Sequence, residues 1–304
     1  MKYTFTLLLI CSLVVCGYSQ TLTDGLMMSK NNLCTGFIYN HDQWKSYWEG
    51  DLKRENGNIG TLTTQSVTWV NNFGITDKIN VIAMVPYVMT NASQGTLHEM
   101  KGVQDLSLGV KYNFFKKELS KSVFKTFGVI NFTTPLTDYT PDFLPLSIGM
   151  ASTNLTYRLT TYYKLQQGWF VNASGGYTWR SNVKLDRTSY YTDNKFYLSD
   201  EVKMHNVFDL FASVGYIKNG LQAELNFMQQ NTLGGGDIRR QDMPFVSNKM
   251  NYSKMGALVM YYLPQVKHLA LRAGATYTLT GRNVGQSTSF MAGALYTIKF
   301  SKNQ

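Results

Sequence analysis

The chain has no long apolar segment beyond its first twenty residues, and it is poor in charge, proline and cysteine. A helix that spans a membrane needs about 20 consecutive apolar residues, so a bundle of transmembrane helices is excluded. Charged residues make up 16% of the chain, against about 25% in a typical soluble domain. Only 6 prolines accompany 20 tyrosines and 17 phenylalanines, which excludes a disordered or collagen-like chain. These absences leave a β-rich protein, either a soluble sandwich or barrel or a transmembrane β-barrel.

The N-terminal segment predicts export from the cytoplasm. Lys2 precedes an apolar stretch over residues 7–15, and the small residues Gly17 and Ser19 follow it. This order is typical of a secretory signal peptide, which we place at residues 1–19. Cys16 also resembles a lipidation site, but the bulky Val15 in front of it argues against lipidation.

Cysteine is limited to three residues, and removal of the signal peptide would leave Cys34 alone. A single cysteine in an exported protein cannot form an internal disulfide, so we expect Cys34 to be a buried apolar residue. The four histidines form no cluster with metal-ligand spacing and have no obvious serine or carboxylate partner. The sequence therefore predicts no metal site, no cofactor and no catalysis.

The formal net charge is +10, which raises the question of a nucleic-acid partner. The basic residues are dispersed, however, and a signal peptide directs the chain away from nucleic acid. We therefore expect no nucleic-acid partner, and we assign the positive charge to contacts with acidic lipid headgroups or anionic solutes.

Apolar and polar residues alternate over segments of about ten residues, a pattern typical of strands with two different faces. In residues 269–280, 169–180 and 221–230 one face is apolar and the other is small and polar. Tyrosine and tryptophan lie near the strand ends on the apolar face, as in the aromatic girdles of membrane barrels. The opposite face is too polar for a dry core. The pattern thus favours a water-filled lumen over the interior of a soluble sandwich.

Short turns alternate with long polar loops, which is typical of outer-membrane barrels. The short turns are expected at 74–77, 116–121, 165–168, 218–220 and 263–267. The long loops are expected near 43–58, 91–103, 134–146, 181–204 and 232–248, with a shorter one at 281–286. The intervening strands are predicted at 31–42, 59–73, 78–90, 104–115, 122–133, 147–160, 168–180, 204–217, 220–231, 249–263, 268–280 and 287–300.

The prediction is therefore an all-β protein, a transmembrane antiparallel β-barrel of about twelve strands over residues 33–304. Residues 20–32 are expected to form a periplasmic arm or an insert in the lumen. The register of 59–73 and 122–133 is left open, because either face of these segments could point inward. The expected location is the outer membrane of a Gram-negative-type bacterium, with outer-membrane lipid as a partner. The final strand, which ends near Phe300, resembles the signal recognised by the barrel-assembly machinery.

Three segments carry a family resemblance. They are residues 73–80 (Phe-Gly-Ile-Thr-Asp-Lys-Ile-Asn) leading into 85–88, residues 102–112, and residues 134–137 (Thr-Pro-Leu-Thr) followed by 146–149. In this order and spacing the chain resembles the outer-membrane transporter family named for the meta-pathway of phenol degradation. The third segment departs from the Pro-Thr-Gly that is common there. The resemblance implies a β-barrel that passes small, often aromatic or hydrophobic, compounds.

Charged residues on the inward face are the candidates for solute contact. By alternation they are Asp105, Lys111, Arg158, Arg180, Asp209, Glu224, Lys254, Arg272 and Lys299. Six are basic and three acidic, so the lumen is expected to favour anionic or polar solutes. The alternative is that these charges pair across the barrel and stiffen it, and that Asp105 only bonds amides at the start of its strand.

Two functions follow from these patterns. The first is a passive channel for a small-molecule solute. The second is a structural or adhesive barrel whose lumen is plugged and whose outer loops bind a partner. Residues 181–204 combine tyrosine, lysine and arginine in a way that suits such binding.

Overall fold

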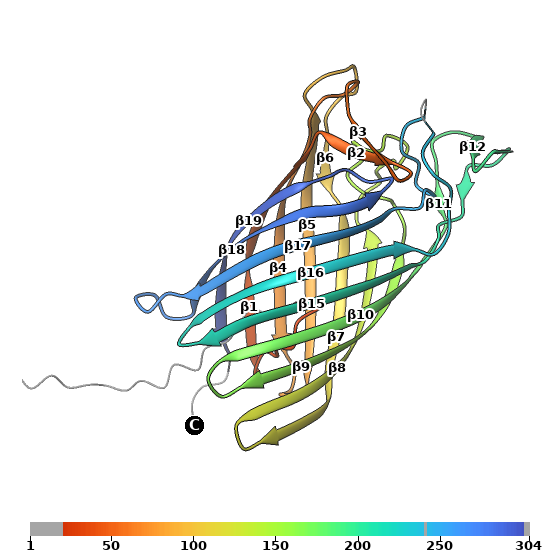
Figure 1. Ribbon diagram of the computed structural model, residues 1–304. Helices are drawn as coiled ribbons and strands as arrows, with labels where there is room; N and C mark the ends of the chain where they lie inside the picture. The colour runs from red at the N-terminus through yellow and green to blue at the C-terminus, as the bar shows by residue number, and fades with distance from the viewer. Residues whose placement is uncertain (1–20, 240–241, 301–304) are drawn as a thin grey trace, which may run out of the picture.

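The computed structural model describes residues 21–239 and 242–300, and almost all of them belong to strands or to the loops between strands (Figure 1). The predicted signal peptide, residue 20 of the predicted arm and residues 301–304 of the predicted barrel lie outside this range. The long strands are β1 (Asn32–Trp44), β4 (Leu62–Gly74), β5 (Ile79–Ala92), β7 (Asp105–Leu119), β8 (Ser122–Pro135), β9 (Asn154–Leu165), β10 (Trp169–Arg180), β15 (Val207–Lys218), β16 (Leu221–Thr232), β17 (Asn251–Tyr262), β18 (Leu269–Arg282) and β19 (Thr288–Lys299).

These strands form a closed antiparallel barrel. Each pairs with its neighbour in the sequence of long strands, and β1 closes the sheet by pairing with β19 from Asn32–Lys299 to Gln43–Thr288. Within the described residues the barrel has twelve long strands, which confirms the predicted fold class. None of the described segments is a helix long and apolar enough to cross a membrane. Closure leaves every strand of the wall hydrogen-bonded on both sides.

Side-chain exposure alternates along the strands as the sequence predicts. In β10, Trp169 and Trp179 are more than half exposed on the outer face, whereas Asn172 and Ser174 are buried on the inner face. In β8 the buried residues Phe127 and Val129 face inward. This determines the register of a segment for which the sequence left both faces open. The wall therefore presents an apolar surface outward and a mainly polar surface inward.

The predicted strand over 147–160 is wrong at its start, because β9 begins at Asn154. Residues Leu146, Ile148 and Met150 alternate as a strand would, but they lie in the preceding loop. Leu146 packs with Ile59 and Leu62, and Met150 packs on a separate cluster of loop residues. Their burial by other loops produced an apolar pattern that alternation alone cannot distinguish from a strand.

The predicted turn over 116–121 is also too long, since β7 continues to Leu119 and only Ser120 and Lys121 connect it to β8. A β-bulge between Asn113 and Phe115 explains the difference. The bulge leaves Phe114 without a partner residue on β8, so Phe114 and Phe115 both lie exposed on the outer surface. One extra residue thus interrupts the two-residue period, which then resumes in the opposite phase.

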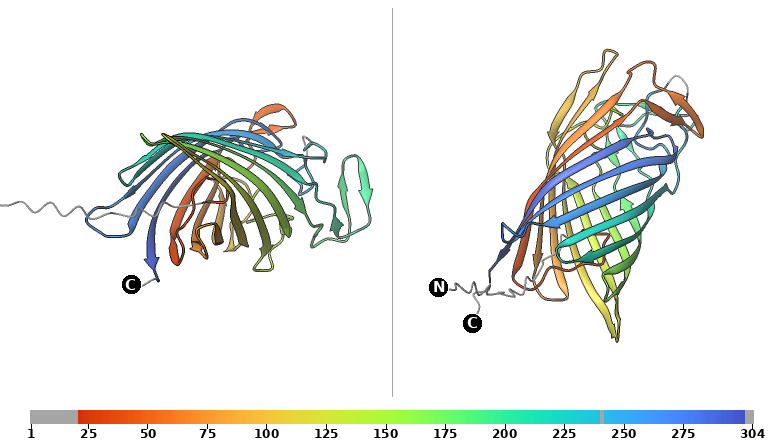
Figure 2. Two further views of the ribbon diagram at one scale, coloured as in Figure 1. Left: turned by 90° about the horizontal axis from the view of Figure 1, so that it is seen from below. Right: turned by 60° about the vertical axis from the view of Figure 1, so that its left-hand side comes forward.

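The end of the barrel opposite the short turns, here called the loop end, carries further small strands. The segment predicted as a loop over 43–58 contains a hairpin of β2 (Ser46–Glu49) and β3 (Leu52–Glu55). The short strand β6 (Met100–Val103) precedes β7 and pairs antiparallel with β5. The loop over 181–204 contains β11 (Val183–Lys184), β12 (Tyr190–Thr192), β13 (Lys195–Tyr197) and β14 (Glu201–Val202). Figure 2 shows these additions gathered at one end of the barrel.

Three outer loops share a small apolar core of their own. Val183, Tyr190 and Val202 of one loop pack against Val246 of the next, with Leu144 of a third beside them. The guanidinium of Arg187 donates to Asp142 Oδ1 at 3.0 Å, which joins two of these loops. The outer loops therefore have a defined structure supported by apolar burial as well as by polar contacts.

Asn283 connects three further loop segments. Its Oδ1 accepts hydrogen bonds from Gly50 N at 2.8 Å and Ile238 N at 3.0 Å. Its Nδ2 donates to Asp237 Oδ1 at 2.7 Å and to Lys249 O at 2.8 Å. The residue is buried and has a φ of 55°, a left-handed conformation that asparagine tolerates better than most residues. The side-chain amide of Asn283 therefore accepts two hydrogen bonds and donates two within this one junction.

Replacing Asn283 with alanine is therefore expected to loosen the loop end. Each backbone N–H left buried without a partner costs about 1–3 kcal/mol, and alanine is strained at positive φ. Limited proteolysis of the folded protein should then cut within 45–61 or 233–250 faster than in the wild type. Asn231→Ala, at the end of the barrel wall, is the control and should leave the cleavage rate unchanged. Equal cleavage in the two variants would contradict this role for Asn283.

The same junction should depend on pH through Asp237. The Arg282 guanidinium, which donates to both Asp237 carboxylate oxygens, and Asn283 hold the pKa of this carboxyl below its usual range. A depressed carboxyl pKa stabilises the folded loops above the unfolded value of about 3.9, and this stabilisation is lost as the pH falls towards the folded value. Loop proteolysis with an acid-active protease should accelerate over this acidic interval. Asp237→Asn should abolish that dependence on pH.

Candidate functional site in the barrel lumen

An N-terminal segment, residues 21–31, lies inside the turn end of the barrel and is here called the arm. Lys111 of β7 holds it: the buried ammonium donates to Thr21 O at 3.0 Å, Asp24 O at 2.5 Å and Asp24 Oδ1 at 2.8 Å. Phe127 of the wall lies 5.2 Å from the same ammonium. A fully buried lysine is stable only when its charge is compensated. Here all three acceptors that hydrogen-bond the Lys111 ammonium belong to the arm.

Other contacts fix the arm along its length. Asn172 Nδ2 of β10 donates to Thr23 O at 2.9 Å, and Leu26 packs with Phe127, Tyr162, Phe170 and Ile217 of the wall. Asp24 also shapes the arm itself, since its carboxylate accepts from Leu26 N at 2.9 Å and Thr21 Oγ1 at 2.9 Å. The arm thus occupies part of the lumen as a folded element.

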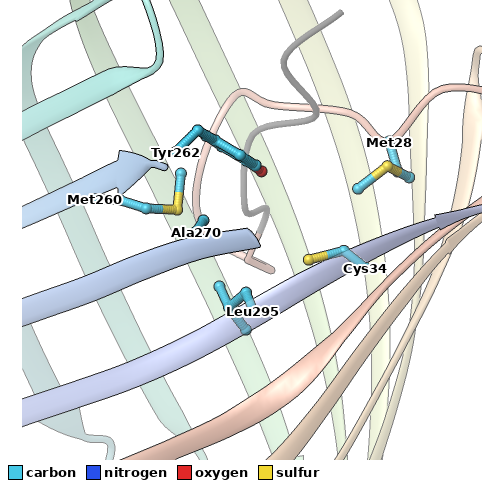
Figure 3. Packing of buried hydrophobic residues seen from close by; sticks show 6 residues of the cluster. All are labelled: Met28, Cys34, Met260, Tyr262, Ala270 and Leu295. Carbon is cyan, nitrogen blue, oxygen red and sulfur yellow. The ribbon is translucent and has the colours of Figure 1, made fainter. Parts of the chain in front are cut away.

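Beyond Leu26, Met28 closes the space beside β1 and the last strands. Figure 3 shows Met28 gathered with Cys34, Met260, Tyr262, Ala270 and Leu295. Cys34 is buried in this cluster, as the sequence predicts. Apolar packing therefore fixes the arm to β1, β17, β18 and β19 as well, in addition to the contacts of Leu26 with the wall on the other side.

Two of the predicted lumen charges pair with each other. Arg158 of β9 and Asp209 of β15 lie 2.7 Å apart across β10, and Arg158 Nη1 also donates to Ser174 Oγ at 3.2 Å. Gly176 lies between them, and a Cβ there would come within 2.7 Å of both charged groups. A larger residue at 176 would separate the pair. For these two residues the geometry matches the alternative of charges that brace the wall.

A cavity of about 220 Å³ lies between the arm and strands β15–β19. Glu224 of β16 and Arg272 of β18 line it, so two more predicted lumen charges share one space. The polar lining is completed by Gln222, Asn226, Asn40 and Asp24, and the apolar lining by Phe211, Met228, Leu258 and Met291. The cavity can therefore contact both the polar and the apolar groups of a small molecule.

The remaining predicted residues lie away from this cavity. Lys254 is on the inner face of β17, with its ammonium 3.3 Å from Ser287 Oγ and 4.9 Å from the Tyr252 ring. Asp105 starts β7 at the loop end, where it accepts a hydrogen bond from Tyr139 Oη at 2.5 Å rather than from turn amides. Burial and the Asp105 carboxylate raise the pKa of Tyr139. Arg180 and Lys299 end their strands, Arg180 at the loop end and Lys299 exposed at the turn end.

Two lumen acids escaped the sequence analysis. Asp24 belongs to the arm, which has no strand period to indicate its direction. Asp42 lies on the inner face of β1, where its carboxylate accepts a hydrogen bond from Ser289 Oγ. Its inward direction could have been predicted, because Phe37 and Tyr39, at alternate positions of the same strand, are exposed on the outer face. Asp24 and Asp42 offset basic residues, so the lumen charge is more balanced than the six-to-three count suggested. Among the described residues, no three metal-binding side chains lie together.

The closed barrel, its polar lumen and its apolar outer wall define a membrane β-barrel. Residues 56–292 match the family model described as putative MetA-pathway of phenol degradation. The chain belongs to this family, which confirms the resemblance seen in the three sequence segments. No curated protein shows significant sequence similarity to the chain.

Solved structures share the fold at low sequence identity. An outer-membrane channel from Pseudomonas putida F1 superposes with a TM-score of 0.71 at 13% identity, over 89% of this chain and 97% of that one. Weaker likenesses are the β-domain of the Bordetella autotransporter Brka (TM-score 0.47, 12% identity, 88% and 100% covered) and the NanC porin (0.47, 9%, 86% and 98%). The fold is thus that of an outer-membrane barrel.

Proposed function

We propose that the protein is a passive outer-membrane channel for small amphiphilic solutes. The observation that carries the proposal is the cavity beside the arm, whose lining includes the charged residues Glu224 and Arg272 and the apolar residues Phe211 and Met291. A lumen that served only as structure would be filled by side chains throughout, as in the smallest barrels. Here the lumen keeps an open space whose lining includes side chains of opposite charge. The short turns face the periplasm in such barrels.

The solute class follows from this lining. A volume of about 220 Å³ is below the usual 300–1,000 Å³ of sites for drug-sized ligands, so the solute is small. A ring or short chain would contact Phe211, Met228 and Met291, while a hydroxyl, carboxylate or amine would bond Arg272, Asn226 or Glu224. This agrees with the aromatic or hydrophobic compounds that the family resemblance implies. Because acidic and basic side chains in the lumen are nearly balanced, we expect no strong preference of the channel for anions.

The arm supports the competing proposal of a plugged barrel with adhesive loops. It occupies the turn end of the lumen, and the outer loops form a structured surface with its own apolar core. The two proposals differ in conduction, since a plugged barrel passes no ions.

Single-channel recording of the purified protein in a planar lipid bilayer separates them. The channel proposal predicts discrete conductance steps with the wild-type protein, in proportion to the amount inserted. Insertion is verified independently by the shift of the folded band on an unheated gel. Verified insertion without any conductance would overturn the channel and favour the plugged barrel.

A further inference from the structure

The net positive charge of the protein is concentrated at one end of the barrel. The rim of the turn end is defined here as residues 29–31, the short turns and the three adjoining residues of each strand. This rim has two acids, Asp77 and Glu118, and no arginine. Its eight lysines are Lys30, Lys78, Lys117, Lys121, Lys164, Lys218, Lys267 and Lys299.

The loop end is different in charge. The outer loops with the three adjoining residues of each strand carry thirteen basic and fifteen acidic residues. Several of these are joined, as in the Arg282–Asp237 and Arg187–Asp142 ion pairs. The lumen charges also pair, as in Arg158–Asp209 and Lys111–Asp24. Outside these two ends the described residues carry six basic and two acidic side chains, so the rim, with eight lysines and two acids, holds the largest share of the positive excess.

Aromatic pairs on the outer wall place this rim at the membrane surface. Trp169 and Tyr216 contact each other at 5.4 Å between ring centroids, close to the turn that follows Lys218. Phe115 and Phe124 do so at 6.0 Å beside Lys117 and the turn residue Lys121. Exposed aromatic side chains near strand ends mark the boundary between hydrocarbon and headgroups. Lysines one to a few residues beyond them reach into the headgroup layer.

The direction of the side chains agrees with this placement. Ile217 is buried inside the barrel, so the exposed Lys218 that follows it points outward. Lys117 pairs with Phe124 and shares its outer face. Lys121 and Lys267 are exposed in the turns themselves. At least four lysines on three hairpins thus point outward, towards the lipid or its headgroup layer.

The choice of lysine indicates the kind of partner. Arginine forms planar, bidentate contacts that suit a fixed carboxylate or phosphate, whereas lysine is a hydrated point charge on a flexible stem. Lysines spread over several turns suit a mobile, diffuse layer of negative charge. We propose that this lysine rim binds the anionic phospholipid headgroups of the periplasmic leaflet, and so selects phosphatidylglycerol over zwitterionic lipid around the turn end of the barrel.

Competition between lipids tests the proposal. The folded full-length mature protein in non-ionic detergent is titrated with phosphatidylglycerol or phosphatidylcholine of the same acyl chains, and retained lipid is counted by native mass spectrometry. The rim variant carries Lys117→Gln, Lys121→Gln, Lys218→Gln and Lys267→Gln. The matched control carries the same change at four exposed lysines of the loop end, Lys101, Lys184, Lys195 and Lys203. A folded-band shift on unheated gels confirms that both variants are intact.

The wild-type protein and the loop-end control should prefer phosphatidylglycerol by about fivefold or more, since each lysine near an anionic surface favours binding by roughly that factor. The rim variant should lose most of this preference, and high salt should remove it from the wild type. Equal retention of the two lipids by the wild type would overturn the proposal. So would an equal loss of preference in the rim variant and the loop-end control.

Discussion

Replacing Lys111 with methionine is expected to release the arm and increase solute flux through the barrel severalfold. Lys111 makes three hydrogen bonds, and all of its acceptors belong to Thr21 and Asp24 of the arm. Methionine keeps the length and apolar stem but removes the charge, which leaves the Asp24 carboxylate without its cation. Removing one partner of a buried ion pair costs about 3–5 kcal/mol. That is enough to favour an arm displaced from the wall.

Liposome swelling with a small neutral sugar measures this effect. The Lys111→Met protein should admit the sugar severalfold faster than the wild type at equal insertion. Lys254→Met is the matched control, because Lys254 is also an inward lysine of the wall but contacts Ser287 and Tyr252 rather than the arm. An unchanged swelling rate for Lys111→Met would show that the arm does not restrict the passage.

Neutralising the two charges that line the cavity should shift ion selectivity in opposite directions. Arg272→Gln should make the channel more selective for cations, and Glu224→Gln should make it more selective for anions. At an effective dielectric constant of about 20, a unit charge changes the energy of an ion about 10 Å away by about 1.7 kcal/mol. Since about 1.4 kcal/mol corresponds to a tenfold ratio, each permeability ratio should change by about tenfold or more before screening by salt.

The reversal potential under a salt gradient reports these ratios. The opposite signs of the two shifts are the internal control, because a general disturbance of the barrel would move both in the same direction. Arg158→Gln is a less direct probe, since it also leaves Asp209 without its partner at 2.7 Å. Shifts of the same sign, or no shift, would mean that ions do not pass beside Glu224 and Arg272.

Much of the barrel could be predicted because its strands are regular and have two different faces. Where the strand is uninterrupted, as in β10 or β16, alternation gives both the strand and its inward residues. Alternation misleads where a bulge interrupts the pattern or where packing between loops produces the same pattern outside a strand. The bulge at Phe114 resets the phase within β7, and the burial of Leu146 by other loops imitates a strand.

The candidate site was less predictable for a different reason. Lys111, Glu224 and Arg272 follow from alternation, but the partner of Lys111 is 87 residues away in a segment without periodicity. No local pattern indicates that Asp24 enters the lumen or that its charge meets Lys111. The same limit applies to Asn283, whose junction gathers Gly50, Ile238 and Lys249 from distant loops. Such contacts depend on closure of the whole barrel.

The central claim is that solute and ions pass through the lumen beside the arm, and thiol modification during current recording tests it most directly. Asn226→Cys places a thiol on the cavity wall, whereas Leu225→Cys places one on the exposed outer face of the same strand. The native Cys34 is buried and should not react. A charged methanethiosulfonate reagent should reduce the current of the Asn226→Cys channel in steps and leave that of Leu225→Cys unchanged. Unaltered current through Asn226→Cys, with its modification confirmed by mass spectrometry, would contradict the account.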